Sequence, residues 1–126
     1  MTAQVVLIVD DDHGYRFPIA NLFSDQGFSV LQADNVESMR ELSSKAGVWI
    51  VDVRLPTEKM EGIEAVRQLW NDQQRPKVFF ISVMPEGTAQ LQLRILQDKS
   101  IPYRWLEKPF ELEVLLTEVN DSLARG

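Results

Sequence analysis

Five short apolar runs, each followed by a segment with helical spacing, constrain the fold of this chain more than any other feature. The runs are rich in β-branched and aromatic residues, and their length and composition are typical of buried strands. We expect strands at residues 4–9, 29–33, 48–52, 76–82 and 102–106. The segments between them predict helices over about 13–26, from 36 toward Gly47, from Gly62 to Trp70, over 88–99 and over 110–124.

The sequence makes a specific prediction for three of these elements. Pro18 removes one backbone hydrogen bond, so the first helix either starts late, with Pro18 in its first turn, or is kinked there. In the fourth helix, Leu91, Ile95 and Leu96 form the predicted inner stripe. The fifth strand is the most polar of the five and is expected at an edge of the sheet.

Strands and helices that alternate in this way form a parallel sheet with helices on both faces. With right-handed crossovers and the common strand order 2-1-3-4-5, we expect an α/β, flavodoxin-like doubly wound five-stranded parallel sheet with five helices. The chain has 126 residues and shows no internal repeat or linker, so residues 1–126 are expected to form one domain.

The composition narrows the function classes. The net charge of −6 makes the domain a poor candidate for direct nucleic-acid binding, which needs a basic surface. Cysteine is absent, which rules out disulfides and thiol chemistry and fits a reducing cytoplasm. The first apolar run, residues 5–9, is too short for a signal-peptide core or a membrane span. We therefore expect a cytoplasmic domain with no membrane partner.

Acidic residues lie directly after two of the predicted strands. Asp10 and Asp11 follow the first strand, and Asp52 ends the third. In a doubly wound sheet the functional crevice lies beyond the carboxyl ends of the strands, at the switch point between strands 1 and 3, so these carboxylates are expected to converge. Two such charges about 4 Å apart repel by roughly 4 kcal/mol at an effective dielectric of about 20, which favours uptake of protons or of a divalent cation. Mg²⁺ suits a site that also receives phosphate oxygens.

The residue types at the strand ends point to phosphoryl transfer. Asp52 is the predicted acceptor, because carboxylates can act as nucleophiles and form aspartyl phosphates. Ser82, which ends the fourth strand, can donate a hydroxyl hydrogen bond, and Lys108, which follows the fifth, can donate an ammonium to a phosphoryl oxygen. Phosphoryl transfer needs such positioning and charge stabilisation more than it needs a base.

In combination, these residues resemble the receiver domain of two-component response regulators, the fold of the single-domain chemotaxis regulator, over essentially the whole chain. The matching positions come in order: Asp10 and Asp11 after VLIV, Asp52 in VDVRLP, Gly62, Ser82 in FFIS, and Lys108-Pro109 in LEKPF. The resemblance implies a signalling switch rather than an enzyme. Its phosphoryl group would come from a sensor histidine kinase or a histidine phosphotransfer protein.

The resemblance also implies a metal site. Asp11, Asp52 and the backbone carbonyl of Arg54 would be direct Mg²⁺ ligands, and Asp10 would act through water. Arg54 and Met84 occupy positions that tune dephosphorylation in the family.

The resemblance also implies how phosphorylation would be sensed and passed to the protein surface. Ser82 and Lys108 would sense the phosphoryl group, and Trp105 occupies the place of the family's switching aromatic residue. The surface of the fourth helix, fifth strand and fifth helix would be the output face toward a downstream domain or protein. The same face is where the resemblance would place a homodimer.

Three features depart from the family pattern. The loop at residues 57–61 looks about two residues longer than usual and is expected to reshape the surroundings of Asp52. Val83 stands where the family prefers alanine or glycine, so its branched side chain is expected to narrow access for small phosphodonors. Trp105 is larger than the usual switch residue, and its inward rotamer is expected to be hindered.

The sequence also allows three alternative functions. These departures favour a receiver-like interaction module that works without phosphorylation. A phosphatase with an aspartyl-phosphate intermediate, like the haloacid dehalogenases, would need a second aspartate two residues after the nucleophile, where this chain has Arg54. A flavodoxin-type FMN protein is disfavoured, because an acidic loop follows the first strand where a phosphate cradle would need free backbone N–H groups.

Overall fold

The computed structural model describes residues 4–54 and 60–125, and its centre is a five-stranded parallel sheet. The strand order β2-β1-β3-β4-β5 confirms the predicted topology. The strands are β1 (Val5–Val9), β2 (Ser29–Ala33), β3 (Val48–Asp52), β4 (Lys77–Ser82) and β5 (Arg104–Glu107). The helices are α1 (His13–Asp25), α2 (Val36–Leu42), α3 (Glu61–Leu69), α4 (Gln90–Asp98) and α5 (Leu112–Ala124), with short 3₁₀ turns at Ser43–Lys45 and Glu86–Ala89.

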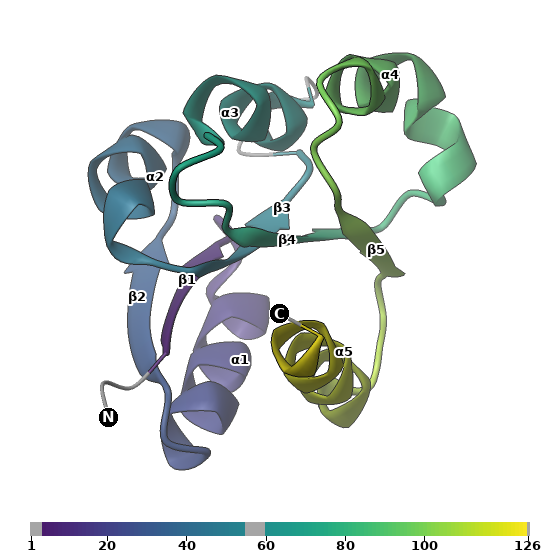
Figure 1. Ribbon diagram of the computed structural model, residues 1–126. Helices are drawn as coiled ribbons and strands as arrows, with labels where there is room; N and C mark the ends of the chain where they lie inside the picture. The colour runs from purple at the N-terminus through teal and green to yellow at the C-terminus, as the bar shows by residue number, and fades with distance from the viewer. Residues whose placement is uncertain (1–3, 55–59, 126) are drawn as a thin grey trace.

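Helices cover both faces of the sheet, with α1 and α5 on one face and α2, α3 and α4 on the other (Figure 1). Alternate residues of the central strands point to opposite faces, as the strand pleat requires. Leu7 and Trp49 belong to the core under α2–α4, whereas Ile8 and Ile50 belong to the core under α1 and α5. Burial on both faces explains why these strands are continuous apolar runs.

Helix α1 begins at His13, where the Asp12 side chain caps it by accepting from the Gly14 N–H at 2.8 Å. Pro18 lies inside the helix. Of the two alternatives for Pro18, the late start is therefore wrong. The carbonyl of Gly14, which would otherwise accept from residue 18, belongs to an exposed residue where water can serve instead.

The predicted inner stripe of α4 is wrong in two of its three members. Leu91 is 73% exposed and Ile95 is 41% exposed, while Leu96 is fully buried. The buried residues of α4 are Leu93 and Leu96, and Ala89 in the preceding 3₁₀ turn is buried four residues before Leu93. The predicted helix started at residue 88, inside a 3₁₀ turn that the sequence prediction did not include, and α4 itself begins two residues later, at Gln90.

Strand β5 lies at the edge of the sheet, as expected, and pairs with β4 alone among the described strands. It begins at Arg104, two residues later than predicted. Pro102 has no backbone N–H to contribute to a strand ladder. No helix within the described residues is both long and apolar enough to span a bilayer.

Candidate phosphoryl and metal site

The acidic residues meet because two neighbouring parallel strands end side by side. Val9 of β1 pairs with Val51 of β3, so Asp10 and Asp52 follow in register. Asp10, Asp11 and Asp52 each offer a carboxylate oxygen, and these oxygens all lie within 4.8 Å of one another. Asp10 and Asp52 are buried, whereas Asp11 is exposed to solvent. The predicted convergence of the three carboxylates is therefore present in the fold.

The Asp10 side chain is fully buried, and hydrogen bonds hold both its carboxylate and its backbone. Its backbone N–H donates to the carbonyl of Ala33 at 3.0 Å, and its Oδ1 accepts from the Asp12 N–H at 2.9 Å. The Nη1 of Arg16 donates to its backbone carbonyl at 2.6 Å. These bonds fix the Asp10 carboxylate at the end of β1.

Arg16 is a supporting residue that the sequence analysis missed. It is only 7% exposed, and its Nε also donates to Gln32 at 3.0 Å, which ties the end of β1 to β2. A signal was present in the sequence: Arg16 stands three and four residues before Ile19 and Ala20, on the buried face of α1. A buried arginine needs such partners for its charge.

The Lys108 side chain reaches the carboxylates from the end of β5, at the same end of the parallel strands. Its Nζ lies 2.9 Å from Asp10 Oδ2 and 3.6 Å from Asp52 Oδ2. The backbone N–H of Lys108 donates to the Ser82 carbonyl at 2.6 Å, which sets the approach of the loop after β5. Sequence reasoning placed Lys108 here. It missed Tyr15, whose ring lies under the ammonium with 4.2 Å from Nζ to the ring centroid.

The electrostatics of the site favour a cation. Burial and then the nearby charge of Asp10 raise the pKa of Asp52, and the opposing effect of the Lys108 charge is smaller, so this pKa lies at about 7. Burial acts to lower the pKa of Lys108, but its hydrogen bond to Asp10 and the charges of Asp52 and Asp10 outweigh burial, so this pKa ends above its ordinary value. A single ammonium thus leaves the carboxylates short of positive charge.

The donor set suits Mg²⁺. Three carboxylates within ligand distance of one ion offer only hard oxygen atoms, and neither histidine nor cysteine is among them. Asp11 is exposed, so water molecules can complete the coordination. The Arg54 N–H donates to Asp52 Oδ1 at 3.3 Å, which places the backbone of Arg54 beside the carboxylate.

Gly62 allows α3 to begin directly against the end of β3. A Cβ at this position would overlap the backbone carbonyl oxygen of Asp52 and lie 3.0 Å from Val51 Cγ1. The Gly62 N–H donates to the Val53 carbonyl at 3.0 Å. A residue with a side chain here would displace the backbone that carries Asp52.

Hydrogen bonds of the loop after β4 connect the site to the edge strand β5. Ser82 is 1% exposed, and its Oγ accepts from the Met84 N–H at 3.0 Å. The carbonyl of Met84 accepts from Trp105 Nε1 at 3.1 Å. Trp105 is half-buried and lies against Phe80, with 5.9 Å between the ring centroids.

Two of the remaining predicted positions are exposed. Val83 is 64% exposed, at the start of the loop that carries Met84. Pro109 is exposed and joined to Lys108 by a cis peptide bond. Of the loop at 57–61, residues 57–59 lie outside the described part of the chain, so the prediction for that loop is untested.

Comparison with known proteins agrees with this geometry. A family profile described as the response regulator receiver domain matches residues 6–120. A cyclic di-GMP phosphodiesterase of Thermotoga maritima is 30% identical over 118 residues, and the transcriptional regulatory protein FixJ of Rhizobium meliloti is 27% identical over 121 residues. Each alignment covers 94% of this chain but only 30% and 56% of those proteins, so the chain spans about half or less of these relatives.

Solved structures show the same architecture. A CheY-like receiver domain protein from Methanospirillum hungatei superposes with a TM-score of 0.82 at 16% identity, over 98% of this chain and 96% of that one. The chemotaxis response regulator CheY4 of Vibrio cholerae gives a TM-score of 0.76 at 25% identity, over 95% and 98% of the two chains.

Proposed function

This chain belongs to the response regulator receiver domain family, a family of signalling modules rather than enzymes, and from that premise we propose that it is a phosphorylation-controlled switch. Residues 1–126 act as one receiver domain in the cytoplasm. Asp52 accepts the phosphoryl group from a sensor histidine kinase or a histidine phosphotransfer protein. The observation that carries the proposal is the cluster of Asp10, Asp11 and Asp52 with the Lys108 ammonium against it.

The transfer is a substitution at phosphorus. An Asp52 carboxylate oxygen forms the new P–O bond while the N–P bond to the partner's histidine breaks, and the electron pair of that bond stays with the imidazole. Mg²⁺ bound by Asp11, Asp52 and the Arg54 carbonyl, with Asp10 acting through water, would supply positive charge for the phosphoryl oxygens. Lys108 donates a further hydrogen bond to one of these oxygens.

The bonds of the loop after β4 support a route for the response. If the Ser82 side chain turns so that its hydroxyl donates to the phosphoryl group, Oγ moves and the Met84 N–H that donates to it must follow or lose this bond. Met84 also accepts from Trp105, so a shift of this loop reaches the face formed by α4, β5 and α5. We propose this face as the output surface toward a downstream domain or protein, and as the homodimer surface where one forms.

Mass spectrometry tests the transfer directly. The protein is incubated with acetyl phosphate and Mg²⁺, and we expect one added phosphoryl group on the peptide that contains Asp52. Asp52→Asn should accept none. Because the branched side chain of Val83 directly follows Ser82, beryllofluoride with Mg²⁺ is the second probe, read by tryptophan fluorescence. The chain has three tryptophans, so Trp105→Phe identifies the one that responds.

A phosphorylation-independent interaction module is the second candidate. The observation that favours it is the Lys108 ammonium, which already neutralises part of the acidic cluster without any ligand. This candidate predicts no response to either probe in the wild type and full partner binding by Asp52→Ala. A phosphoryl group on Asp52 together with a fluorescence change would exclude it.

A further inference from the structure

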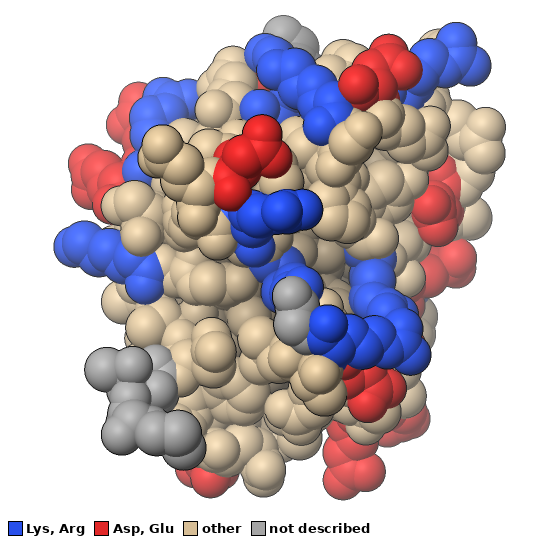
Figure 2. Space-filling view, viewed as in Figure 1, with Lys and Arg blue, Asp and Glu red and all other residues tan. Residues whose placement is uncertain are grey.

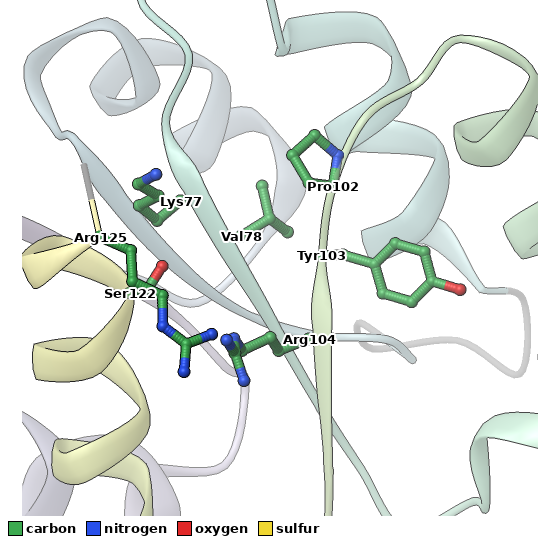
Figure 3. A pocket seen from close by; sticks show the side chains of 7 residues that line it. All are labelled: Lys77, Val78, Pro102, Tyr103, Arg104, Ser122 and Arg125. Atoms are coloured by element: carbon green, nitrogen blue, oxygen red, sulfur yellow. The ribbon is translucent and has the colours of Figure 1, made fainter.

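A basic hollow lies at the amino-terminal ends of the strands, at the opposite end of the sheet from Asp52. It has a volume of about 420 Å³ and lies where β4 and β5 begin and α5 ends. Blue side chains gather over this region in Figure 2, although the chain carries a net charge of −6. The described residues that line the hollow, labelled in Figure 3, are Lys77, Val78, Pro102, Tyr103, Arg104, Ser122 and Arg125.

The hollow presents hydrogen-bond donors and no carboxylate among its described lining residues. The guanidinium groups of Arg104 and Arg125 point toward one another in Figure 3, and the Ser122 hydroxyl lies beside Arg125. The hollow is lined by three cationic side chains, those of Lys77, Arg104 and Arg125. The charge of Arg104 is balanced by Glu118, whose Oε2 lies 2.7 Å from Arg104 Nη1. In the described part of the chain, the side chains of Lys77 and Arg125 have no such carboxylate partner.

Like charges that share one space repel, and an anion between them removes that cost. Guanidinium groups match phosphate oxygens with two parallel hydrogen bonds, and a lysine adds a point charge. The volume falls within the range of small-ligand pockets, roughly 300–1,000 Å³, and exceeds what a single phosphate needs. We propose that this hollow binds a di- or triphosphate group, in inorganic or nucleoside form, independently of the site at Asp52.

Calorimetry with the full chain tests the proposal. Titrations use sodium tripolyphosphate, ATP and adenosine in EDTA, because without Mg²⁺ the acidic cluster repels these anions. We expect tripolyphosphate and ATP to bind with a dissociation constant below about 1 mM, and adenosine not to bind. Equal affinities would assign recognition to the phosphate chain alone, whereas tighter binding of ATP would assign a nucleotide. Amide NMR shifts should centre on Lys77, Arg104 and Arg125.

A charge-matched pair of variants provides the control. The double variant Lys77→Gln/Arg125→Gln should weaken tripolyphosphate binding at least about tenfold. The double variant Arg94→Gln/Lys99→Gln removes the same charge from exposed residues on and beside α4, and it should change the affinity less than about twofold. No measurable binding, equal loss in both double variants, or shifts centred on Asp10 and Asp52 would overturn the proposal.

Discussion

The indole N–H of Trp105 donates to the backbone carbonyl of Met84 across 3.1 Å. Trp105 belongs to the edge strand β5, and Met84 to the loop after β4. The N–H of the same Met84 residue donates to Ser82 Oγ in the proposed phosphoryl pocket. The backbone of Met84 is therefore hydrogen-bonded both to Ser82 in the proposed pocket and to Trp105 at the proposed output face.

Trp105→Phe tests this link. Phenylalanine keeps the contact with Phe80 but loses the N–H donor, so Asp52 should still be phosphorylated while the response at α4 becomes smaller. Amide NMR shifts of Leu93 and Leu96 on adding beryllofluoride and Mg²⁺ measure that response. Amide shifts of unchanged size in the variant would show that the hydrogen bond from Trp105 to Met84 does not transmit the response to α4.

Lys108→Met should destabilise the protein most when no Mg²⁺ is present. Removal of the ammonium leaves two buried carboxylates without their cation, and breaking a buried pair costs about 3–5 kcal/mol. Urea unfolding at pH 8 in EDTA measures the loss, and added Mg²⁺ should recover part of it. Lys99→Met, at an exposed position, is the control and should change the free energy of unfolding by less than about 0.5 kcal/mol.

The titration of Asp52 should lower the free energy of unfolding as the pH rises. Its pKa is raised from 3.8 to about 7 in the folded protein, so the folded state holds this proton more tightly than the unfolded chain does. The resulting stability is fully present below pH 3.8 and is lost as the pH rises through about 7. Between pH 5 and 8 in EDTA, the wild type should lose roughly 1 kcal/mol or more relative to Asp52→Asn. Parallel curves for the two proteins would contradict the assignment.

Tyr15→Leu should weaken the hold on the Lys108 ammonium, whereas Tyr15→Phe should preserve it, because the ring face and not the hydroxyl contacts Nζ. The expected cost of the leucine variant is about 0.5–2 kcal/mol in the free energy of unfolding. A double-mutant cycle with Lys108→Met separates this contact from general packing. A coupling energy near zero would show that the ring only fills space.

Gly62→Ala should destabilise the protein by roughly 1–3 kcal/mol, because the new methyl group would overlap the backbone carbonyl oxygen of Asp52 and force the backbone at β3 or α3 to shift. Gly87→Ala is the matched control, since a Cβ there meets nothing within 4 Å. Thermal unfolding of both variants measures the difference. A Gly62→Ala variant as stable as the control would mean that the start of α3 can shift.

The sheet and the central acids were predictable because simple geometry determines them. Parallel strands end at a common edge, so an aspartate directly after β1 must lie beside one at the end of β3. Lys108 followed from the same rule, since β5 ends at that edge too. The roles of Tyr15 and Arg16 were not predicted, because periodicity shows which face of α1 is buried but not what a polar residue contacts there. The predicted face of α4 was wrong, because the exposed pair Leu91 and Ile95 has helical spacing just as the buried pair Leu93 and Leu96 does, and spacing alone does not say which pair is buried.

The position of Lys108 has a consequence for the order of events at the site. Its ammonium lies 2.9 Å from Asp10 Oδ2 and 3.6 Å from Asp52 Oδ2, so it already supplies positive charge to two of the three carboxylates of the proposed metal site. We expect a bound divalent ion to weaken the hold of these carboxylates on the amine, which would leave Lys108 free to reach the phosphoryl oxygens. Depletion of divalent ions should then leave the side chain docked on Asp10 and slow phosphorylation even when donor is abundant.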